Sequence, residues 1–320
     1  MSDSQNKFVV YLRITENCNA KCFMCRFAQE NRNLFISNEQ LDYILTYARN
    51  NNVRLIRFTG GEPLLDANLP LHIQRCNSLG IKTSAITNGL LLSKQIDKLV
   101  SSGLNQIIIS VDGSIPELHN RIRGTLGLLE NIEEALLMIS KKYPSLLVRI
   151  NTVVSPENLH DLPNIARWLM RYGVHQWSII PIKLDENPWK DLKLDIFLEC
   201  YLAFSESIKS TNIRLMGYSD QWAGSNITEC VRFYNGDYFV RPKCKCNLAK
   251  MVSFYDPFTN RFYPCNCTPH RKNERSDIDN YNEMASWYYE NGGRYCKGCE
   301  PINAYCADFP ETLHKSIFNF

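Results

Sequence analysis

The sequence predicts an α/β fold: an open, partial barrel of six strand–helix units, followed by a small cysteine-rich domain. Three observations lead to this prediction. Short β-branched runs alternate with amphipathic helical runs across residues 8–210. Glycine-rich or polar motifs follow most of the predicted strands. The chain of 320 residues also holds 13 cysteines, most of them gathered near its two ends.

The individual elements follow from residue patterns. The predicted strands are Phe8–Ile14, Arg54–Phe58, Lys82–Ile86, Gln106–Val111, Leu147–Val153 and Trp177–Ile180. The predicted helices are Asn38–Asn50, Leu69–Leu79, Ser93–Ser102, Leu128–Lys142, Asn158–Tyr172 and Leu194–Ser210. Ser37 and Gln40 have the spacing of a capping box at the start of the first helix. Gly80 and Gly103 stand where glycines end helices.

Strand–helix alternation at this spacing predicts a parallel sheet with crossover helices. Six units are fewer than the eight of a closed barrel, so we expect a partial (βα)6 TIM-like barrel. A doubly wound sheet is the alternative. We assign residues 1–212 to the barrel and 213–320 to the second domain, because the alternation ends there and the sequence becomes aromatic, turn-rich and cysteine-rich.

Composition excludes several classes of protein. Hydrophobic residues make up 44% of the chain, which is typical of a folded protein. The 36 basic residues nearly balance the 33 acidic ones, so nothing calls for nucleic acid or an anionic membrane as a partner. The N-terminus is polar, and no apolar run is long enough for a signal peptide or a membrane span. We therefore expect a cytoplasmic protein with reduced thiols, which favours metal or redox roles for its cysteines.

The unusual motifs fall at the same end of the predicted strands. The barrel rule places active sites at the carboxyl ends of parallel strands. Asn17-Cys18 follows the first strand, Thr59–Pro63 the second and Thr87–Gly89 the third, while Ser110–Gly113 ends the fourth. The sequence thus predicts one functional rim.

Three cysteines on this rim have the spacing C-x3-C-x2-C. Cys18, Cys22 and Cys25 have no fourth cysteine nearby, which suits a four-iron four-sulfur cluster with one iron open to a small-molecule ligand. The alternative is a zinc site completed by a histidine. The first histidine of the chain is His72, far from this motif along the sequence.

The cysteine motif together with the later Gly60-Gly61-Glu62-Pro63 resembles the radical S-adenosylmethionine (SAM) superfamily. The resemblance covers about residues 7–210. It implies that the open iron binds the amino and carboxylate groups of SAM. It further implies that an electron from the cluster cleaves SAM to methionine and a 5′-deoxyadenosyl radical, which takes a hydrogen atom from the substrate.

Other site residues follow from the resemblance one at a time. Gly60, Gly61 and Glu62 are similar to the segment that holds the methionine amino group. Ser110 and Asp112 match positions near the ribose and methionyl end.

Two further positions bear on SAM. Arg123, in an H-x3-R pattern with His119, would pair with the SAM carboxylate, as a bidentate arginine can. Met24 stands where the family usually has an aromatic residue near the adenine, and its soft apolar side chain can pack there instead.

The C-terminal cysteines resemble the SPASM/twitch extension of radical SAM enzymes. Residues 256–265 read as a β-hairpin ending in a cysteine, and Asn260 can replace the usual turn glycine because asparagine tolerates a left-handed conformation. The ligands expected of one auxiliary [4Fe-4S] cluster are Cys246, Cys265, Cys296 and Cys299. Cys244 competes with Cys246 for the first position, and a zinc ribbon is the alternative for the whole region.

The expected function is that of a radical SAM oxidoreductase or isomerase acting on a small sugar-like metabolite of the aminoglycoside or nucleoside type. The outcome would be epimerisation, dehydrogenation or decarboxylation, with Cys230 and Cys306 as candidate hydrogen-atom donors for epimerisation. Only 17 residues precede Cys18, which favours a small substrate over a peptide, since peptide-modifying relatives often carry a recognition domain there. The alternatives are epimerisation or cross-linking of a ribosomal precursor peptide, and a non-catalytic iron–sulfur or zinc protein. A flavodoxin or ferredoxin would supply electrons.

Overall fold

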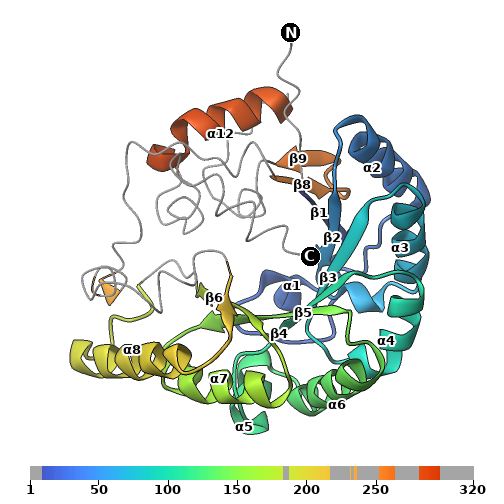
Figure 1. Ribbon diagram of the computed structural model, residues 1–320. Coiled ribbons are helices and arrows are strands. Elements are labelled where there is room, and N and C mark those ends of the chain that lie inside the picture. Colours follow the sequence, from blue (N-terminus) through green and yellow to red (C-terminus); the bar gives the residue numbers. More distant parts are fainter. Residues whose placement is uncertain are drawn as a thin grey trace.

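The computed structural model describes residues 9–182, 187–216, 231, 234–235, 252–263 and 281–295. Its main feature is one sheet of nine strands in the order β7-β6-β5-β4-β3-β2-β1-β8-β9. All neighbouring strands are parallel except the pair β8 and β9. The sheet curves as an arc, with helices α2, α3, α4, α6, α7 and α8 along its outer side (Figure 1).

The predicted elements of the barrel are confirmed to within a few residues. The strands are β1 Val9–Thr15, β2 Leu55–Gly60, β3 Lys82–Thr87, β4 Gln106–Ser110, β5 Leu147–Val154 and β6 Gln176–Pro181. The outer helices are α2 Asn38–Asn50, α3 Leu69–Ser78, α4 Leu92–Ser101, α6 Leu128–Lys142, α7 Leu162–Arg171 and α8 Leu194–Lys209. The capping box of Ser37 and Gln40 forms at the start of α2, and Gly80 and Gly103 adopt positive φ just after their helices.

The strand order distinguishes the two folds that the sequence left open. From β1 to β7 (Arg214–Leu215), each strand lies beside the next one along the chain. A doubly wound sheet would instead reverse its order at a switch point and carry helices on both faces. The monotonic order and the one-sided helices therefore identify a partial TIM-like barrel.

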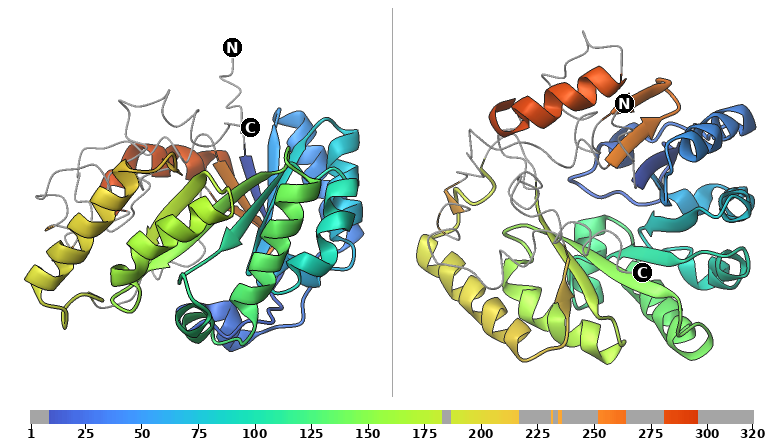
Figure 2. Two further views of the ribbon diagram at one scale, coloured as in Figure 1. Left: turned by 60° about the horizontal axis from the view of Figure 1, so that its bottom comes forward. Right: turned by 45° about the horizontal axis from the view of Figure 1, so that its top comes forward.

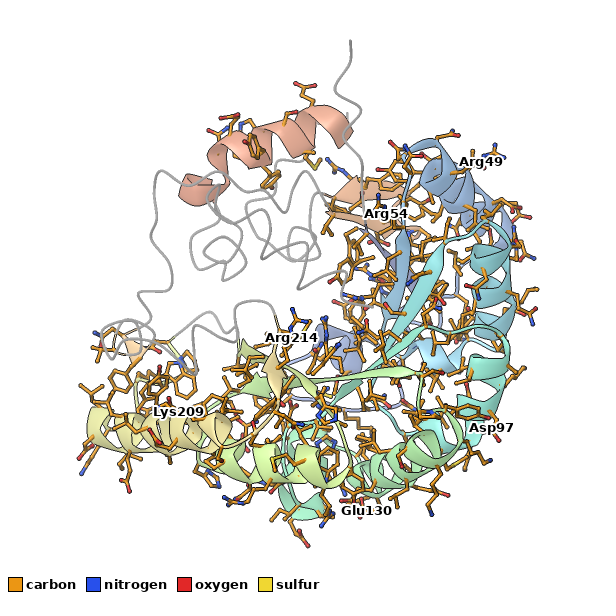
Figure 3. All side chains as sticks on the ribbon, viewed as in Figure 1. Arg49, Arg54, Asp97, Glu130, Lys209 and Arg214 are labelled. Atoms are coloured by element: carbon orange, nitrogen blue, oxygen red, sulfur yellow. The ribbon has the colours of Figure 1, made fainter. Side chains whose placement is uncertain are left out.

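The hydrophobic core lies between the sheet and its outer helices. Ile56 and Phe58 of β2 are fully buried in it, together with Ile44 of α2 and Ile73 of α3. Because side chains alternate along a strand, Arg57 points to the opposite, concave face. A charged side chain on an outer helix, such as Asp97 of α4, instead points away from the sheet (Figure 3).

The region after the barrel adds two strands to the same sheet. β8 (Val252–Asp256) pairs parallel with β1, and β9 (Arg261–Tyr263) pairs antiparallel with β8. This confirms the predicted hairpin, and Asn260 in its turn has φ +52°. The pairing of β8 with β1 in one sheet was not predicted. α12 (Tyr281–Tyr295) lies close to this hairpin in Figure 1.

Short helices occupy two stretches that the sequence analysis left without structure, α1 (Arg26–Glu30) and α5 (Pro116–Arg123). Both lie at the lower end of the sheet in the left view of Figure 2. Within the ranges that the structure describes, no helix has the length and apolar character needed to cross a membrane.

Many of the C-terminal assignments lie outside the described residues. These are the proposed auxiliary ligands and their competitor, Cys244, Cys246, Cys265, Cys296 and Cys299, and the two candidate hydrogen-atom donors, Cys230 and Cys306.

Candidate functional site

The three N-terminal cysteines lie on the loop that leaves β1. Cys18 and Cys25 are partly buried and Cys22 is buried, and all three are free thiols. Asn31 accepts a hydrogen bond from the backbone N–H of Cys18, and Cys25 N–H donates to the carbonyl of Cys22. The chain is thereby wound into a tight loop. Met24, between Cys22 and Cys25, is partly buried against the hydrophobic core.

Burial and neighbouring groups raise the pKa values of two of the three thiols. Burial raises the pKa of Cys18 to about 11, and the sulfurs of Cys22 and Cys25 add to the rise. Burial also raises the pKa of Cys22, while the Arg123 guanidinium opposes the rise. Thiols of raised pKa are protonated at neutral pH, so metal binding at this loop must release protons.

The donor set fits an iron–sulfur cluster better than a zinc ion. Among the described residues, no three His, Cys, Asp or Glu side chains converge as ligands of a single metal ion would. A four-iron cluster takes each thiolate on a different iron, so its ligands are not expected to converge on one point. His72 pairs with Asp66 inside the protein, at 3.1 Å between Nε2 and Oδ2.

Two glycines, Gly60 at the end of β2 and Gly61 just after it, allow this strand to contact the end of β1 and the cysteine loop. Gly61 N–H donates to the Thr15 carbonyl at 2.9 Å, and Glu62 N–H donates to the Asn17 carbonyl at 2.8 Å. A Cβ at Gly60 would lie 2.1 Å from the Thr15 carbonyl oxygen, and one at Gly61 would lie 2.2 Å from that of Asn17. The close approach that requires glycine here is therefore to the end of β1 and to the start of the cysteine loop.

Replacing Gly61 with alanine should push the cysteine loop away from β2. We expect the free energy of unfolding to fall by about 1–3 kcal/mol, the usual cost of overpacking, with weaker retention of iron. Denaturant unfolding and iron analysis would measure both. Gly80→Ala is the comparison, because a Cβ there meets no atom within 4 Å and only its positive φ is strained. Equal iron retention in the two variants would contradict this account.

Glu62 is almost completely buried at the centre of the rim. Its carboxylate accepts hydrogen bonds from the backbone N–H groups of Leu64 and Asn88 and from the Thr87 hydroxyl, at 3.0, 2.7 and 2.7 Å. Burial nevertheless raises the pKa of Glu62 to about 7. The carboxylate thus connects the ends of β2 and β3 beneath the cysteine loop.

The raised pKa of Glu62 predicts a pH-dependent stability. Between pH 4.5 and 7 the folded carboxyl keeps a proton that the unfolded chain releases, so the free energy of unfolding falls as pH rises. A shift of this size corresponds to a loss of about 3 kcal/mol, complete above pH 7. Urea unfolding of metal-free protein from pH 4.5 to 8 should show this slope, and Glu62→Gln should flatten it. Parallel curves for the two proteins would contradict the prediction.

The end of β4 supplies the other predicted residues. Asp112 is fully buried; its Oδ1 accepts from the backbone N–H of Val153 at 2.7 Å, and its Oδ2 lies 2.6 Å from Arg123 Nε. Ser110 is partly buried, in register with Asn151 of β5. Both oxygens of Asp112 are thus engaged within the protein, which makes it a support for Arg123.

Arg123 ends α5 and faces the cysteine loop. Although burial opposes it, the neighbouring Asp112 carboxylate and Cys22 sulfur raise the pKa of Arg123, so the guanidinium stays charged. His119, one turn earlier, accepts a hydrogen bond at Nδ1 from the Asp112 N–H. Burial, with help from Arg123, lowers the pKa of His119 well below its usual range, so its imidazole is neutral.

The structure therefore brings together Cys18, Cys22, Cys25, Gly60, Gly61, Glu62, Ser110, Asp112 and Arg123 at one rim, as predicted. Asn88, in the predicted rim motif Thr87–Gly89, lies at the same rim: its Nδ2 donates to Asn19 Oδ1 at 2.7 Å and lies 3.9 Å from Cys18 Sγ. Its contact with the cysteine loop was not predicted.

Comparisons with known proteins agree with this arrangement. Residues 12–169 match the model of the radical SAM superfamily. The chain is 29% identical over 200 residues to a probable GTP 3′,8-cyclase of Sulfurisphaera tokodaii, covering 59% of this chain and 62% of that protein. It is 32% identical over 197 residues to one of Methanococcus aeolicus, covering 58% and 64%. The match thus spans less than two thirds of either relative.

Solved structures share the fold at low identity. Streptococcus suis SuiB bound to S-adenosylmethionine has a TM-score of 0.64 at 14% identity, covering 89% of this chain and 66% of SuiB. The enzyme anSMEcpe with bound AdoMet and a peptide has a TM-score of 0.62 at 18% identity, covering 93% and 88%. Members of the matched family bind a [4Fe-4S] cluster and SAM. Residues 12–169 of this chain are therefore a radical SAM domain.

Proposed function

We propose that this chain is a radical SAM enzyme that removes a hydrogen atom from a purine nucleotide or a related anionic nucleoside derivative. The observation that supports the radical SAM assignment is that the loop of three cysteines, the Gly60–Glu62 turn and Arg123 lie together on one rim. When bound there, the cluster and SAM supply a 5′-deoxyadenosyl radical.

The chain's own residues have distinct parts in this proposal. Cys18, Cys22 and Cys25 hold the cluster, and the carbonyl groups and turn around Gly61 shape the space beside it. Glu62 offers a buried carboxylate to the SAM amino group, and that positive charge would favour its ionised form. Met24 and Ser110 remain the candidates for contact with the adenosyl part. A one-electron donor such as a flavodoxin or ferredoxin is proposed as the reductant.

The nucleotide substrate is supported first by the relatives. The proteins of about 30% identity are named for a reaction on GTP, whereas the peptide-bound structural neighbour is 18% identical and supports the fold alone. The relatives are named as cyclases, so they give no support to the expected epimerisation of a sugar or modification of a peptide. A nucleoside-type substrate is the part of the earlier expectation that they favour.

A buried arginine on the concave face supports an anionic substrate. Arg57 is 3% exposed, and its guanidinium donates to Ser84 Oγ, Tyr11 Oη and Gln106 Oε1 at 2.9, 2.9 and 3.3 Å. All three partners are neutral, and no described carboxylate forms an ion pair with it. A buried charge without a counter-charge is costly, and a phosphate group nearby would offset that cost.

The test is transfer of deuterium from labelled substrates to 5′-deoxyadenosine. Reconstituted, reduced protein with SAM would be offered ribose-deuterated purine nucleoside triphosphates, deuterated amino sugars and deuterated peptides in separate reactions. The proposal expects deuterium in 5′-deoxyadenosine from the nucleotides, and the product mass then reports the outcome. Transfer from a peptide or an amino sugar alone would overturn the substrate assignment.

A further inference from the structure

Two side chains present N–H groups to the cysteines of the loop. Asn88 Nδ2 lies 3.9 Å from Cys18 Sγ, and Arg123 Nη1 lies 3.8 Å from Cys22 Sγ. Both distances are within the range of N–H···S hydrogen bonds. Of the two donors, only the Arg123 side chain is charged, so it places a positive charge beside the Cys22 sulfur.

Arg123 belongs to a buried row of contacts. The Val153 N–H donates to Asp112 Oδ1 at 2.7 Å, Asp112 Oδ2 lies 2.6 Å from Arg123 Nε, and Arg123 Nη1 reaches Cys22. Asp112 is fully buried and Arg123 is 9% exposed. A positive charge, its counter-charge and a cysteine sulfur are therefore in line where little water can screen them.

The backbone keeps this row in place. The Arg123 carbonyl accepts a hydrogen bond from Lys21 N–H at 3.1 Å, which ties the end of α5 to the cysteine loop. The next residue, Gly124, has φ +61°, and a Cβ there would lie 2.4 Å from the Lys21 carbonyl oxygen. On the other side, His119 accepts the Asp112 N–H. The guanidinium position is thus fixed by α5, β4 and the loop together.

We propose that Asp112 and Arg123 are positioning residues that set the reduction potential of the cluster through the hydrogen bond to Cys22 Sγ. The inference rests on the proposed function, in that Cys22 must be a cluster ligand. Reduction adds one electron from an external donor to the cluster, and no bond forms or breaks. Hydrogen bonds to cluster sulfurs and nearby positive charge favour the reduced form, whereas the Asp112 carboxylate moderates the effect.

The opposite signs of the two charges give the test. Each variant would be reconstituted without SAM, and the midpoint potential of its cluster measured by titration followed by EPR. Arg123→Gln should lower the midpoint potential relative to the unchanged protein, and Asp112→Asn should raise it. The midpoint potential of Arg123→Lys should lie between those of Arg123→Gln and the unchanged protein, because lysine keeps the positive charge but lacks the forked N–H groups of the guanidinium. Omitting SAM separates this effect from any pairing of Arg123 with its carboxylate.

A matched control lies on the same helix. Arg121 is exposed and pairs with Glu157 at 3.2 Å, so Arg121→Gln removes the same charge from α5 away from the sulfur and should leave the midpoint unchanged. Circular dichroism and iron content would confirm folding and loading. If Asp112→Asn does not assemble a cluster, the difference in midpoint potential between Arg123→Gln and Arg123→Lys tests the inference by itself.

The inference and the proposed function fail in distinguishable ways. Equal midpoints for Arg123→Gln, Arg123→Lys and Arg121→Gln would overturn the inference while leaving the cluster assignment intact. Failure of the unchanged protein to bind iron at Cys18, Cys22 and Cys25 would overturn the proposed function itself.

Discussion

Replacing Cys18, Cys22 and Cys25 together with alanine should abolish formation of 5′-deoxyadenosine from SAM. The loop would lose all three thiolates that the proposed cluster requires. Anaerobic reconstitution followed by iron analysis and chromatography of the SAM products would measure the loss. The unchanged protein should bind about four more irons than the variant.

A matched control uses a cysteine remote from the loop. Cys76 is fully buried in α3, and its pKa is raised to about 12 by burial, so it is an inert thiol. Cys76→Ala should keep the iron content and the SAM cleavage of the unchanged protein. Persistent 5′-deoxyadenosine formation by the triple variant would show that another site cleaves SAM. Any iron left in the triple variant would report on the proposed auxiliary cluster at Cys246, Cys265, Cys296 and Cys299.

Replacement of Arg13 should cause the largest loss of stability. Arg13 Nη1 lies 2.6 Å from Asp256 Oδ2 and 3.1 Å from Glu16 Oε1, and all three residues are at most 3% exposed. Its guanidinium also lies over the rings of Phe27 and Phe254. Arg13→Met would leave the Asp256 carboxylate buried without this partner. Removing one partner of a buried ion pair costs about 3–5 kcal/mol in the free energy of unfolding.

A double-mutant cycle would separate this interaction from general damage. The double variant Arg13→Met with Asp256→Asn should lose less stability than the sum of the two single variants, because neither buried charge is then left alone. Lys142→Met is the control for an exposed pair, since Lys142 and Asp97 are each 54% exposed, and exposed pairs contribute at most about 1 kcal/mol. Strictly additive losses would contradict the proposed coupling between β1 and the hairpin of β8 and β9.

The barrel and its rim could be predicted because their signals are local. Strand and helix periodicity, the capping box at Ser37 and the turn glycines each involve residues close together in the chain. Motifs at strand ends then meet because parallel strands place their carboxyl ends at one edge. α5 was missed although Pro116 at its start and Gly124 at its end are typical helix boundaries, because the stretch between them was read as a loop.

The features that the sequence did not predict depend on contacts between segments far apart in the chain. The union of β8 with β1 joins residues about 240 positions apart, as in the pair of Arg13 with Asp256. No local pattern marks such a pairing. The same holds for the contact of Asp112 with Arg123, which the sequence did not predict. The packing of β4 against β5 and α5 determines that the Asp112 carboxylate contacts Arg123.

The central claim is that the loop of Cys18, Cys22 and Cys25 carries a cluster whose open iron binds SAM. EPR spectroscopy of the reduced cluster before and after addition of SAM tests it most directly. Protein with Cys246, Cys265, Cys296 and Cys299 replaced by alanine would isolate this cluster from any auxiliary one. The account predicts a four-iron signal whose g-values shift when SAM is added. A signal unchanged by saturating SAM would contradict it.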